Sequence, residues 1–437
     1  MLAARVATEV AFQVASHVAP VRGSKLWRSL AARRGLLERV ATAARAVRSP
    51  ARPLVWMHAP SVGEGLQARP VAHRLRALHP DLQLAYTFFS PSAESFAPSI
   101  GADITDYLPF DGRREADAML DALQPTALVF VKLDVWPILV ERATARNIPV
   151  ALLSATLAAR SGRSGAWSRR LVRDAYRALA GVGAIDEENG SRLIDLGVRR
   201  DVLEVTGDTR FDQVWARAEA VDRAQPMLQA LASTRPTLVA GSTWAADEAV
   251  LLGAFARLVR AGAHDSDAAA RPRLLIAPHE PTHAHLAPIF EWARRANVSF
   301  TTLSAAETDR PAAASDVIVV DRIGVLGDLY ALADVAFVGG GFHAAGLHSV
   351  IEPAAFGAPV LFGPGHHMSR EAGLLLNVGG ARVVADAEAL ESGLRAWLFT
   401  SNARATAGEA ARALVQSELG ATARSVRLVQ RLLREQI

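Results

Sequence analysis

Two doubly wound α/β domains, each a parallel sheet with helices on both faces, are the fold that the sequence predicts. The chain has 437 residues, about three times the usual domain unit, of which 50% are apolar and 21% charged. From residue 53 onward, strand-like apolar runs alternate with helix-like runs, which favours parallel sheets. The alternation pauses between about residues 214 and 236 and then restarts. We therefore place one domain at residues 1–220 and the other at residues 221–437.

The first domain is predicted from short apolar runs separated by turn residues and amphipathic stretches. Such runs are typical of strands in a parallel sheet, because both faces of the sheet are covered. The expected strands are residues 54–58, 82–88, 127–131, 150–153, 183–185 and 203–206, and the expected helices are residues 66–78 and 136–146.

The second domain repeats this pattern. Its expected strands are residues 237–241, 273–277, 317–320, 335–338 and 359–362, and a helix is expected at residues 246–260. Residues 263–270 are predicted to be a surface loop, and the last thirty residues are predicted to be helical. Ligands of doubly wound sheets bind at the carboxyl ends of the strands, so we expect a site in a cleft between the two domains.

Composition excludes several classes of protein. Without cysteine, the chain has no disulfides, zinc-thiolate sites, iron–sulfur clusters or thiol nucleophile. The formal charge of +4 is too small to indicate nucleic acid as a partner. Residues 10–21 form the longest uncharged stretch near the N-terminus, which is too short and too polar to span a bilayer. A signal peptide is not expected either, because a basic start followed by a smooth apolar core and a cleavage site is missing.

The N-terminal segment is strongly basic. Residues 1–52 contain ten Lys or Arg residues and two Glu residues, which gives a net charge of +8. Basic helical segments bind anionic membrane surfaces, with about 1 kcal/mol for each basic residue near the lipid. We therefore expect this segment to lie on a membrane surface. The alternatives are a solvated helix and a segment that grips its own domain.

Glu64 is the first candidate catalytic residue. It closes the run Ser61-Val62-Gly63-Glu64, which lies between a predicted strand and a predicted helix. A carboxylate at this edge could act as a general base toward an alcohol. It could equally do no more than complement the helix dipole, which is worth under about 1 kcal/mol.

Two sequence motifs resemble known signatures but fit them poorly. The run Gly339-Gly340-Gly341 follows a predicted strand, yet the acid that a dinucleotide site requires about twenty residues later is missing. Residues 279–283 spell H-E-x-x-H, but Pro281 is tolerated only in a first helical turn. His279 would then precede the helix, so we expect a strand-end loop that contacts a ligand. A dehydrogenase and a zinc hydrolase are both disfavoured.

Further polar residues follow predicted strands of both domains. The histidines 343, 348, 366 and 367 could hold a metal, but no carboxylate or thiol spacing supports one, so loop contacts are favoured. Glu352 could bind the hydroxyls of a ribose or could cap a helix. Lys132 and Arg210 follow strands and could face an anionic ligand, although the local pattern alone makes them surface ion-pair residues.

The order of these motifs resembles one family, the Kdo transferases. Enzymes of that family attach 3-deoxy-D-manno-oct-2-ulosonic acid (Kdo) to lipid A precursors in Gram-negative bacteria. The resemblance extends from about residue 27 to residue 389. It depends on the runs at residues 58–64, 132–137, 207–212, 241–243, 321–324, 329–331, 337–340, 347–353 and 359–364.

The resemblance implies a GT-B fold, with two Rossmann-like domains that face a central cleft. The N-terminal domain would face the membrane and take the lipid acceptor, and the C-terminal domain would bind CMP-Kdo. It implies an inverting transferase that moves Kdo from CMP-Kdo to lipid IVA, needs no metal or other cofactor, and lies peripherally on the cytoplasmic face of the inner membrane. An anionic membrane surface would be a further partner.

The resemblance also assigns roles to individual residues. Glu64 would be the general base, and Lys132 and Arg210 would stabilise the transition state. The nucleotide contacts would be made by Pro278, His279, Ile323, Gly324, Val325, Ser349, Val350, Ile351 and Glu352.

This sequence departs from the family pattern at several of these positions. Many members have Glu where Lys132 stands, Lys where Arg210 stands and Asn where Ser349 stands. Many have arginines around His279 and Met-Gly-Glu in place of Ile323-Gly324-Val325. The alternatives are a GT-B enzyme that uses another nucleotide sugar, and a nonenzymatic nucleotide- or lipid-binding protein with this fold.

Overall fold

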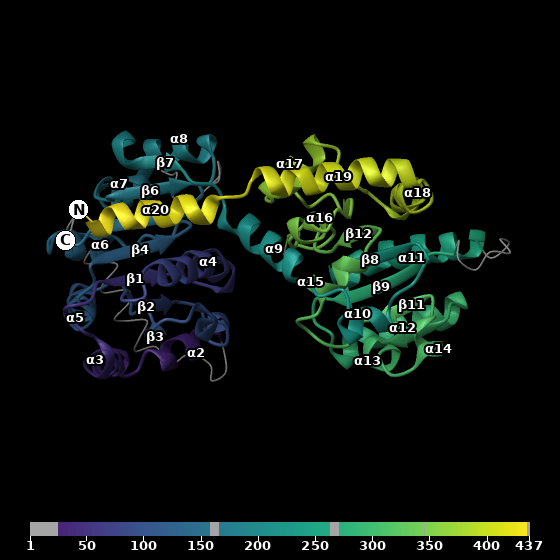
Figure 1. Cartoon of the computed structure of the whole chain (residues 1–437), viewed down its shortest axis with the longest axis horizontal. Coiled ribbons are helices and arrows are strands. Elements are labelled where there is room, and N and C mark those ends of the chain that lie inside the picture. Colours follow the sequence, from purple (N-terminus) through teal and green to yellow (C-terminus); the bar gives the residue numbers. More distant parts are fainter. Residues whose placement is uncertain (1–24, 158–165, 263–270, 345, 435–437) are drawn as a thin grey trace. The chain divides into compact units, whose positions relative to one another are not determined.

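A computed structural model describes residues 25–157, 166–262, 271–344 and 346–434 of the chain (Figure 1). The chain divides into two compact units. The first contains residues Met1–Gln213 and Glu418–Ile437, and the second contains residues Val214–Ser417. The boundary between residues 213 and 214 falls within helix α9 (Thr209–Ala220).

The first unit is built on a seven-stranded sheet in which every pair of neighbouring strands is parallel. The strand order is β3-β2-β1-β4-β5-β6-β7. The strands are β1 (Leu54–His58), β2 (Gln83–Phe88), β3 (Ile104–Tyr107), β4 (Ala127–Val131), β5 (Val150–Ala155), β6 (Gly181–Ala184) and β7 (Leu203–Val205). Every residue of β1, β2, β4 and β5 is buried, as expected where helices cover both faces.

Helices cover both faces of this sheet. They are α2 (Lys25–Ala32), α3 (Leu36–Val47), α4 (Val62–Leu78), α5 (Arg113–Leu123), α6 (Pro137–Thr144), α7 (Ala166–Arg177), α8 (Glu187–Leu196) and α20 (Ala421–Arg434). Short 3₁₀ turns lie at η1 (Pro91–Ala93), η2 (Ala97–Ile100) and η4 (Arg200–Val202). The unit has one apolar core, to which residues of all the central strands contribute.

The second unit has the same architecture, with the strand order β10-β11-β9-β8-β12-β13-β14 and parallel pairing throughout. The strands are β8 (Thr237–Thr243), β9 (Arg273–Pro278), β10 (Phe300–Thr302), β11 (Val317–Val319), β12 (Val335–Val338), β13 (Val360–Phe362) and β14 (Ala381–Val383). The helices are α10 (Pro226–Ala230), α11 (Ala245–Gly262), α12 (His283–Ala296), α13 (Leu303–Ala306), α14 (Arg310–Ala313), α15 (Leu326–Leu329), α16 (Ile351–Ala355), α17 (Arg370–Asn377), α18 (Ala387–Leu398) and α19 (Ser401–Ser417), with a 3₁₀ turn at η6 (Tyr330–Leu332).

The two faces of the second sheet carry separate apolar cores. Successive residues of strand β8 alternate between them: Leu238 and Ala240 belong to the core beneath α11, α12 and α18, and Val239 belongs to the core beneath α10 and α13. This alternation follows from the two-residue period of a strand. The predicted class, two doubly wound parallel sheets, is therefore confirmed.

The division of the chain differs from the predicted one at the C-terminus. We expected every residue after 220 in the second domain, but helix α20 packs on α4 and on strands β4, β5 and β6 of the first unit (Figure 1). Its apolar stripe, which includes Val426, Val429 and Leu432, is part of the first unit's core. An amphipathic pattern indicates that a helix has an apolar face, but not which sheet that face covers.

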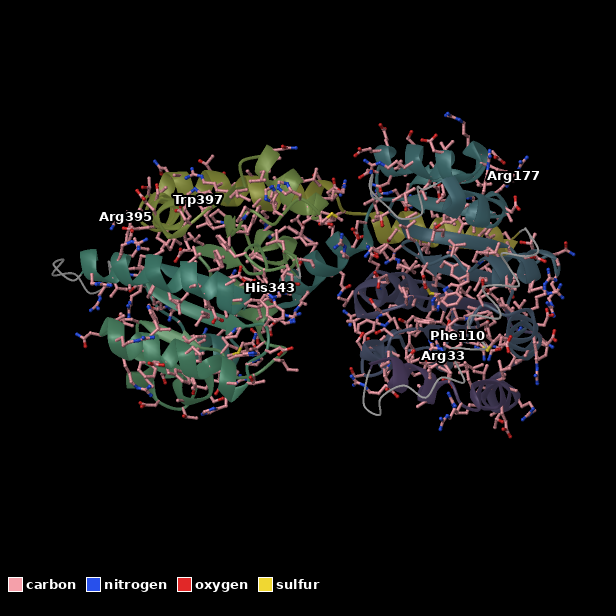
Figure 2. All side chains as sticks on the ribbon, turned by 180° about the vertical axis from the view of Figure 1, so that it is seen from behind. Arg33, Phe110, Arg177, His343, Arg395 and Trp397 are labelled. Atoms are coloured by element: carbon pink, nitrogen blue, oxygen red, sulfur yellow. The ribbon has the colours of Figure 1, made fainter. Side chains whose placement is uncertain are left out.

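Four arginines of the basic N-terminal segment form contacts within the first unit. The Arg33 guanidinium donates to the carbonyls of Leu108 and Phe89 and lies over the rings of Phe89 and Phe110 (Figure 2). Arg39 forms an ion pair with Asp106. Arg48 and Arg52 donate to backbone carbonyls as well. One alternative, a segment that grips its domain, therefore holds for these four arginines, whereas residues 1–24 lie outside the described residues.

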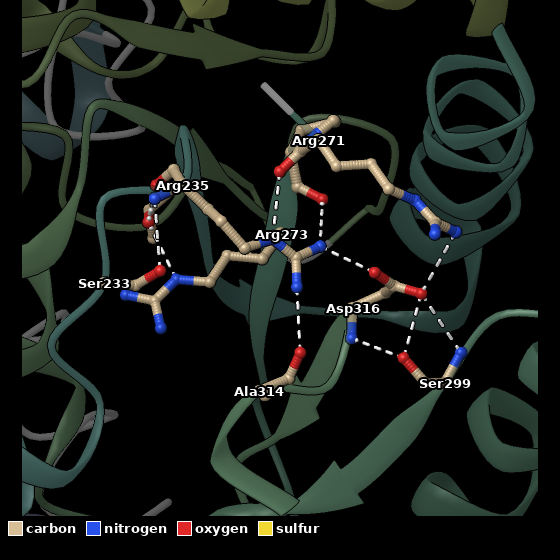
Figure 3. A network of polar contacts seen from close by, with 9 residues as sticks. Ser233, Arg235, Arg271, Arg273, Ser299, Ala314 and Asp316 are labelled. Carbon is tan, nitrogen blue, oxygen red and sulfur yellow. Dashed lines mark hydrogen bonds and ion pairs between the residues drawn. The ribbon is translucent and has the colours of Figure 1, made fainter. Parts of the chain in front are cut away.

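Charges at the amino ends of the second sheet's strands are joined in an internal network (Figure 3). Asp316 accepts hydrogen bonds from Arg235 Nη2 at 2.6 Å and from Ser299 Oγ at 2.9 Å. Burial, together with the charge of Arg235, lowers the pKa of the nearby Arg273 to about 10. This network fixes the starts of neighbouring strands.

Candidate functional site

Glu64 lies in the first turn of helix α4, just beyond the carboxyl end of strand β1. Ser61, the residue before the helix, has an extended backbone, and its hydroxyl donates to Glu64 Oε2 instead of capping the helix. Lys132 Nζ donates to the other carboxylate oxygen, Oε1, at 2.8 Å. Two catalytic candidates that are 68 residues apart in the chain are thus in direct contact.

Lys132 reaches Glu64 from the loop after strand β4. Its φ of 68° lies in the left-handed region, which costs a non-glycine residue about 1–3 kcal/mol. The backbone N–H of Lys132 donates to the carbonyl of Leu153 on strand β5, and this bond holds the conformation. The side chain of Lys132 is 46% exposed, so the ammonium remains accessible to solvent.

The surroundings of Glu64 favour its ionised form. Burial alone would raise the pKa of this carboxyl, but the hydrogen bonds from Lys132 and Ser61 outweigh burial and place the pKa below its usual value. A carboxylate at neutral pH can accept a proton, so the group is in the form that a general base requires. A complement to the helix dipole would not need these two side-chain contacts.

A buried histidine next to this pair was not singled out from the sequence. His58, at the end of β1, contacts Thr87 Oγ1 through Nδ1 and Asp134 Oδ2 through Nε2, both at 3.0 Å. Asp134 Oδ2 also accepts from Trp136 Nε1 at 2.9 Å. Because a carboxylate can only accept, Nε2 of His58 carries the hydrogen in its contact with Asp134. It holds the loop from Lys132 to Trp136 against β1.

Arg210 is attached to the same helix as Glu64 through a buried carboxylate. Asp208 is completely buried and accepts from Nε and Nη2 of Arg210, and from Nε2 of Gln67 at 3.1 Å. Gln67 lies three residues after Glu64 on helix α4. Burial would raise the pKa of Asp208, but the charge of Arg210 and these hydrogen bonds lower it. The Arg210 side chain is 38% exposed and so is open to solvent.

In the second unit, a cation that sequence reasoning missed contacts one predicted nucleotide loop and acts electrostatically on another. Arg217, on helix α9, donates from Nη2 to the carbonyl of Gly324 at 3.4 Å and to Asp328 at 3.3 Å. Partial burial raises the pKa of Glu352, while the charge of Arg217 and a hydrogen bond from Ser349 act in the opposite direction. Glu352 lies in the first turn of α16, directly after Ser349 to Ile351.

Four rings from different strand ends stack in the second unit. Trp244 lies parallel to His343, with ring centroids 4.4 Å apart, and stacks on His279 at 4.5 Å. His279 stacks in turn on His348 at 4.6 Å, and Trp244 Nε1 donates to His348 Nε2 at 3.1 Å. Burial, and then the nearby His279, lowers the pKa of His348. Trp244 therefore organises three histidines, yet it was not among the predicted site residues.

The structure explains the two runs that only partly match known signatures, residues 279–283 and residues 339–341. Helix α12 begins at His283, so His279 and Glu280 precede it, as expected from Pro281. The N–H groups of Gly340 and Phe342 donate to the buried Asp247, which also accepts from Trp244 N. A Cβ at Gly340 would come 2.1 Å from the carbonyl oxygen of Gly346, so glycine is required there for close packing.

Membrane-spanning helices and metal-binding clusters are both absent from the described residues. None of the described helices is long and apolar enough to cross a membrane. No group of three or more His, Cys, Asp or Glu side chains in the described ranges is placed to hold a metal ion. His366 and His367 contact each other, with ring centroids 4.5 Å apart.

Two doubly wound units in one chain define a protein of the GT-B class. Solved structures agree with this fold at low sequence identity. A UDP-GlcNAc 2-epimerase from Neisseria meningitidis bound to UDP-GlcNAc has a TM-score of 0.60 and 13% identity and covers 87% of this chain and 100% of its own. A glycosyltransferase from Rickettsia africae ESF-5 has a TM-score of 0.59 and 11% identity and covers 88% of this chain and 98% of its own.

Sequence comparisons define the family. Residues 29–213 match the family model described as 3-Deoxy-D-manno-octulosonic-acid transferase (kdotransferase). A 3-deoxy-D-manno-octulosonic acid transferase from Bordetella pertussis is 32% identical over 381 residues, which cover 85% of this chain and 86% of that protein. The corresponding protein from Haemophilus influenzae is 26% identical over 86% of both chains. The chain belongs to the 3-deoxy-D-manno-octulosonic acid transferase family.

Proposed function

We propose that the chain is an inverting glycosyltransferase that moves Kdo from CMP-Kdo to a lipid A precursor, lipid IVA, in lipopolysaccharide biosynthesis, with Glu64 as the general base. Family membership supports the reaction class and the donor. The observation that carries the assignment of the base is the contact of one ionised, half-buried carboxylate with both Ser61 and Lys132 at the carboxyl edge of a parallel sheet.

In this reaction, Glu64 takes the proton of an acceptor hydroxyl while the hydroxyl oxygen attacks the anomeric carbon of CMP-Kdo. The bond between that carbon and the phosphate oxygen breaks, and CMP leaves with the bonding electron pair. Each carboxylate oxygen of Glu64 already accepts one hydrogen bond and retains a lone pair for the incoming proton. The leaving phosphate gains negative charge, which positioned cations and amides stabilise.

We assign the supply of positive charge to Lys132 and Arg210, which are accessible to solvent and are held by Glu64 and Asp208. With these cations, the reaction needs no metal ion. The nucleotide is assigned to the loops of the second unit at Pro278 and His279, at Ile323 to Val325 and at Ser349 to Glu352. Arg217 supports this assignment, because it contacts the Gly324 loop and acts electrostatically on Glu352.

A mass-spectrometric assay tests the reaction. Purified protein is incubated with freshly generated CMP-Kdo and lipid IVA, and the mass of the lipid is followed. An increase in steps of one Kdo supports the donor and the acceptor together. An unchanged lipid, with folded protein and intact CMP-Kdo, would mean that the departures at His279, Val325 and Ser349 select another substrate.

A matched pair of variants tests the base. Glu64→Gln is expected to lose at least about a hundredfold in rate, because a general base contributes roughly 10²–10⁴-fold. CMP affinity should be retained. Glu38→Gln is the control, since Glu38 is an exposed acid in the first turn of α3 and so shares the helix position but not the contacts. Full activity of Glu64→Gln would refute the role of the base.

We further propose that the protein lies peripherally on the cytoplasmic face of the inner membrane, held by basic residues near its N-terminus. Since Arg33, Arg39, Arg48 and Arg52 have partners within the first unit, this contact is assigned to the other six cations of residues 1–52, of which Arg5, Arg22 and Lys25 are chosen for the test. Replacing these three with Gln should lower flotation with anionic vesicles. Replacing the exposed Arg114, Arg200 and Arg295 changes the charge equally and is expected to have a smaller effect. Equal losses would contradict the assignment.

A further inference from the structure

A pocket of about 590 Å³ lies in the second unit between the N-terminal halves of helices α11 and α12. This volume is within the range of small-molecule sites, roughly 300–1,000 Å³. Apolar side chains dominate its wall, including Trp244, Leu252, Pro288, Ile289 and Trp292. The indole of Trp292 and the ring of Trp244, which is itself stacked on His279 and His343, add aromatic surface against which an apolar body can pack.

Apart from the titratable His285, the charged side chains of this pocket are acidic. Glu248 and Glu280 line it together with His285, and none of its lining residues is Lys or Arg. CMP-Kdo carries a phosphate and a carboxylate, and an acidic wall without Lys or Arg does not suit these two anionic groups. The pocket therefore differs in charge from a site for the anionic part of the donor, although its wall includes Pro278, one of the predicted nucleotide contacts.

Glu248 supplies the specific polar contact. It is only 9% exposed, and in the described part of the chain its one hydrogen bond comes from Thr243 Oγ1, at 2.8 Å to Oε1. Glu248 also lines the pocket. Burial raises the pKa of this carboxyl against the effect of the hydrogen bond from Thr243. A largely buried carboxylate is stabilised by a hydrogen-bond donor that carries positive charge.

We propose that this pocket is a second ligand site that binds a small organic ammonium compound, with the ammonium on Glu248 and the aromatic or branched apolar body against Trp244 and Trp292. The site goes beyond the proposed transfer reaction, since neither the donor nor the anionic headgroup of the acceptor carries an ammonium group on an apolar body. Its existence is tested by direct binding, independently of transferase activity.

Three probes that share an indole body separate the contribution of charge from that of the ring. Titration calorimetry with the full-length protein is carried out with tryptamine, a cation; tryptophol, a neutral alcohol; and indole-3-propionate, an anion. We expect tryptamine to bind at least about tenfold more tightly than indole-3-propionate, because a charge-assisted hydrogen bond replaces a repulsion. Equal affinity for cation and anion, or no binding of any probe, would overturn the proposal.

Variants locate the binding. Glu248→Gln keeps the shape of the side chain and should weaken tryptamine about tenfold while tryptophol changes by no more than about twofold. Ala249→Phe, at an exposed residue of the wall, should abolish binding by filling the pocket. Glu291→Gln, at an exposed acid of α12 outside the wall, is the control. Unchanged tryptamine affinity in Ala249→Phe would place the probe elsewhere.

Competition with CMP distinguishes this site from the nucleotide loops. A saturating concentration of CMP should leave bound tryptamine in place, which calorimetry in the presence of CMP measures directly. Displacement would mean that the amine occupies the nucleotide site and would refute a second site. Thermal melting of each variant confirms that it is folded, so a loss of binding cannot be a loss of structure.

Discussion

The carboxyl edges of the two sheets share one topology and carry different chemistry. In the first unit, the candidate catalytic side chains form ion pairs, Glu64 with Lys132 and Arg210 with Asp208. In the second unit, the corresponding edge holds a stack of rings around Trp244. A doubly wound sheet thus determines where a site lies, and the residues after each strand determine what the site can do.

The difference also predicts how each edge responds to substitution. Removing one member of an ion pair leaves an uncompensated charge, which is costly where the partner is buried. Removing one ring of a stack loses contact area and leaves no charge behind. Substitutions in the first unit should therefore have the larger effects.

The largest expected effect in this comparison follows from Asp208→Asn. The side chain is completely buried beneath the Arg210 guanidinium, so the variant should lose about 2 kcal/mol of unfolding free energy or more. Denaturant unfolding measures this loss. Asp328→Asn is the control. Asp328 pairs with Arg217 and is more exposed than Asp208, so its loss should cost under about 1 kcal/mol of unfolding free energy. Equal losses of unfolding free energy in the two variants would show that burial does not make the Asp208–Arg210 pair the more important one.

The same carboxylate gives a pH dependence with a defined sign. Because the pKa of Asp208 is lower in the folded state than its ordinary value of 3.8, its contribution to stability is complete above that value. The contribution disappears as the pH falls through the folded-state pKa. Asp208→Asn should therefore remove part of the acid dependence of stability below about pH 4, as measured by unfolding at a series of pH values. An unchanged acid dependence would contradict the shift.

A smaller effect is expected from Lys132→Met. Without the ammonium, Glu64 loses a contact that lowers its pKa, so the acid limb of the pH–rate profile should move to higher pH. The rate at neutral pH should also fall, by about tenfold if the cation stabilises the leaving phosphate. Lys132→Arg keeps the charge and should retain the wild-type acid limb. If the acid limb stays at the wild-type pH in both variants, Lys132 does not determine the pKa of Glu64.

The smallest effect is expected from Trp244→Phe. Phenylalanine retains a ring against His279 and His343 but lacks the Nε1–H that donates to His348. We expect CMP affinity to fall about threefold to tenfold, in keeping with roughly 1 kcal/mol for a neutral hydrogen bond. Unfolding free energy should change little. Calorimetry with CMP measures the affinity, and a loss of a hundredfold would show that Trp244 contacts the nucleotide itself.

Much of the fold could be predicted because apolar runs such as residues 127–131 are long, continuous and separated by amphipathic stretches. The edge strands β3, β10 and β14 were not predicted, since three or four residues are too few for a recognisable period, although the equally short edge strand β7 was. The sequence also did not indicate which sheet α20 packs on, because its apolar stripe could cover either sheet.

The candidate site was predicted in its residue types but not in its contacts. Glu64 and Lys132 were selected because each follows a predicted strand. Their 2.8 Å contact depends on the left-handed backbone at Lys132, which the local sequence does not predict. His58, Asp208 and Trp244 were missed for a related reason. Their roles come from partners brought in by the sheet topology, and a strand-end tryptophan or buried aspartate has no signature of its own.

The return of the chain through α20 has a consequence for the order of folding during synthesis. The second unit is a continuous insertion, Val214–Ser417, whose entry and exit are fastened together where Asp212 accepts hydrogen bonds from the N–H groups of Gly420 and Thr422. Domains generally fold as the ribosome delivers them. Here the core of the first unit includes Val426 and Leu428 of α20, so it cannot be completed before that helix is synthesised. The inserted unit precedes α20 in the chain, and we therefore expect it to fold before the first unit is complete.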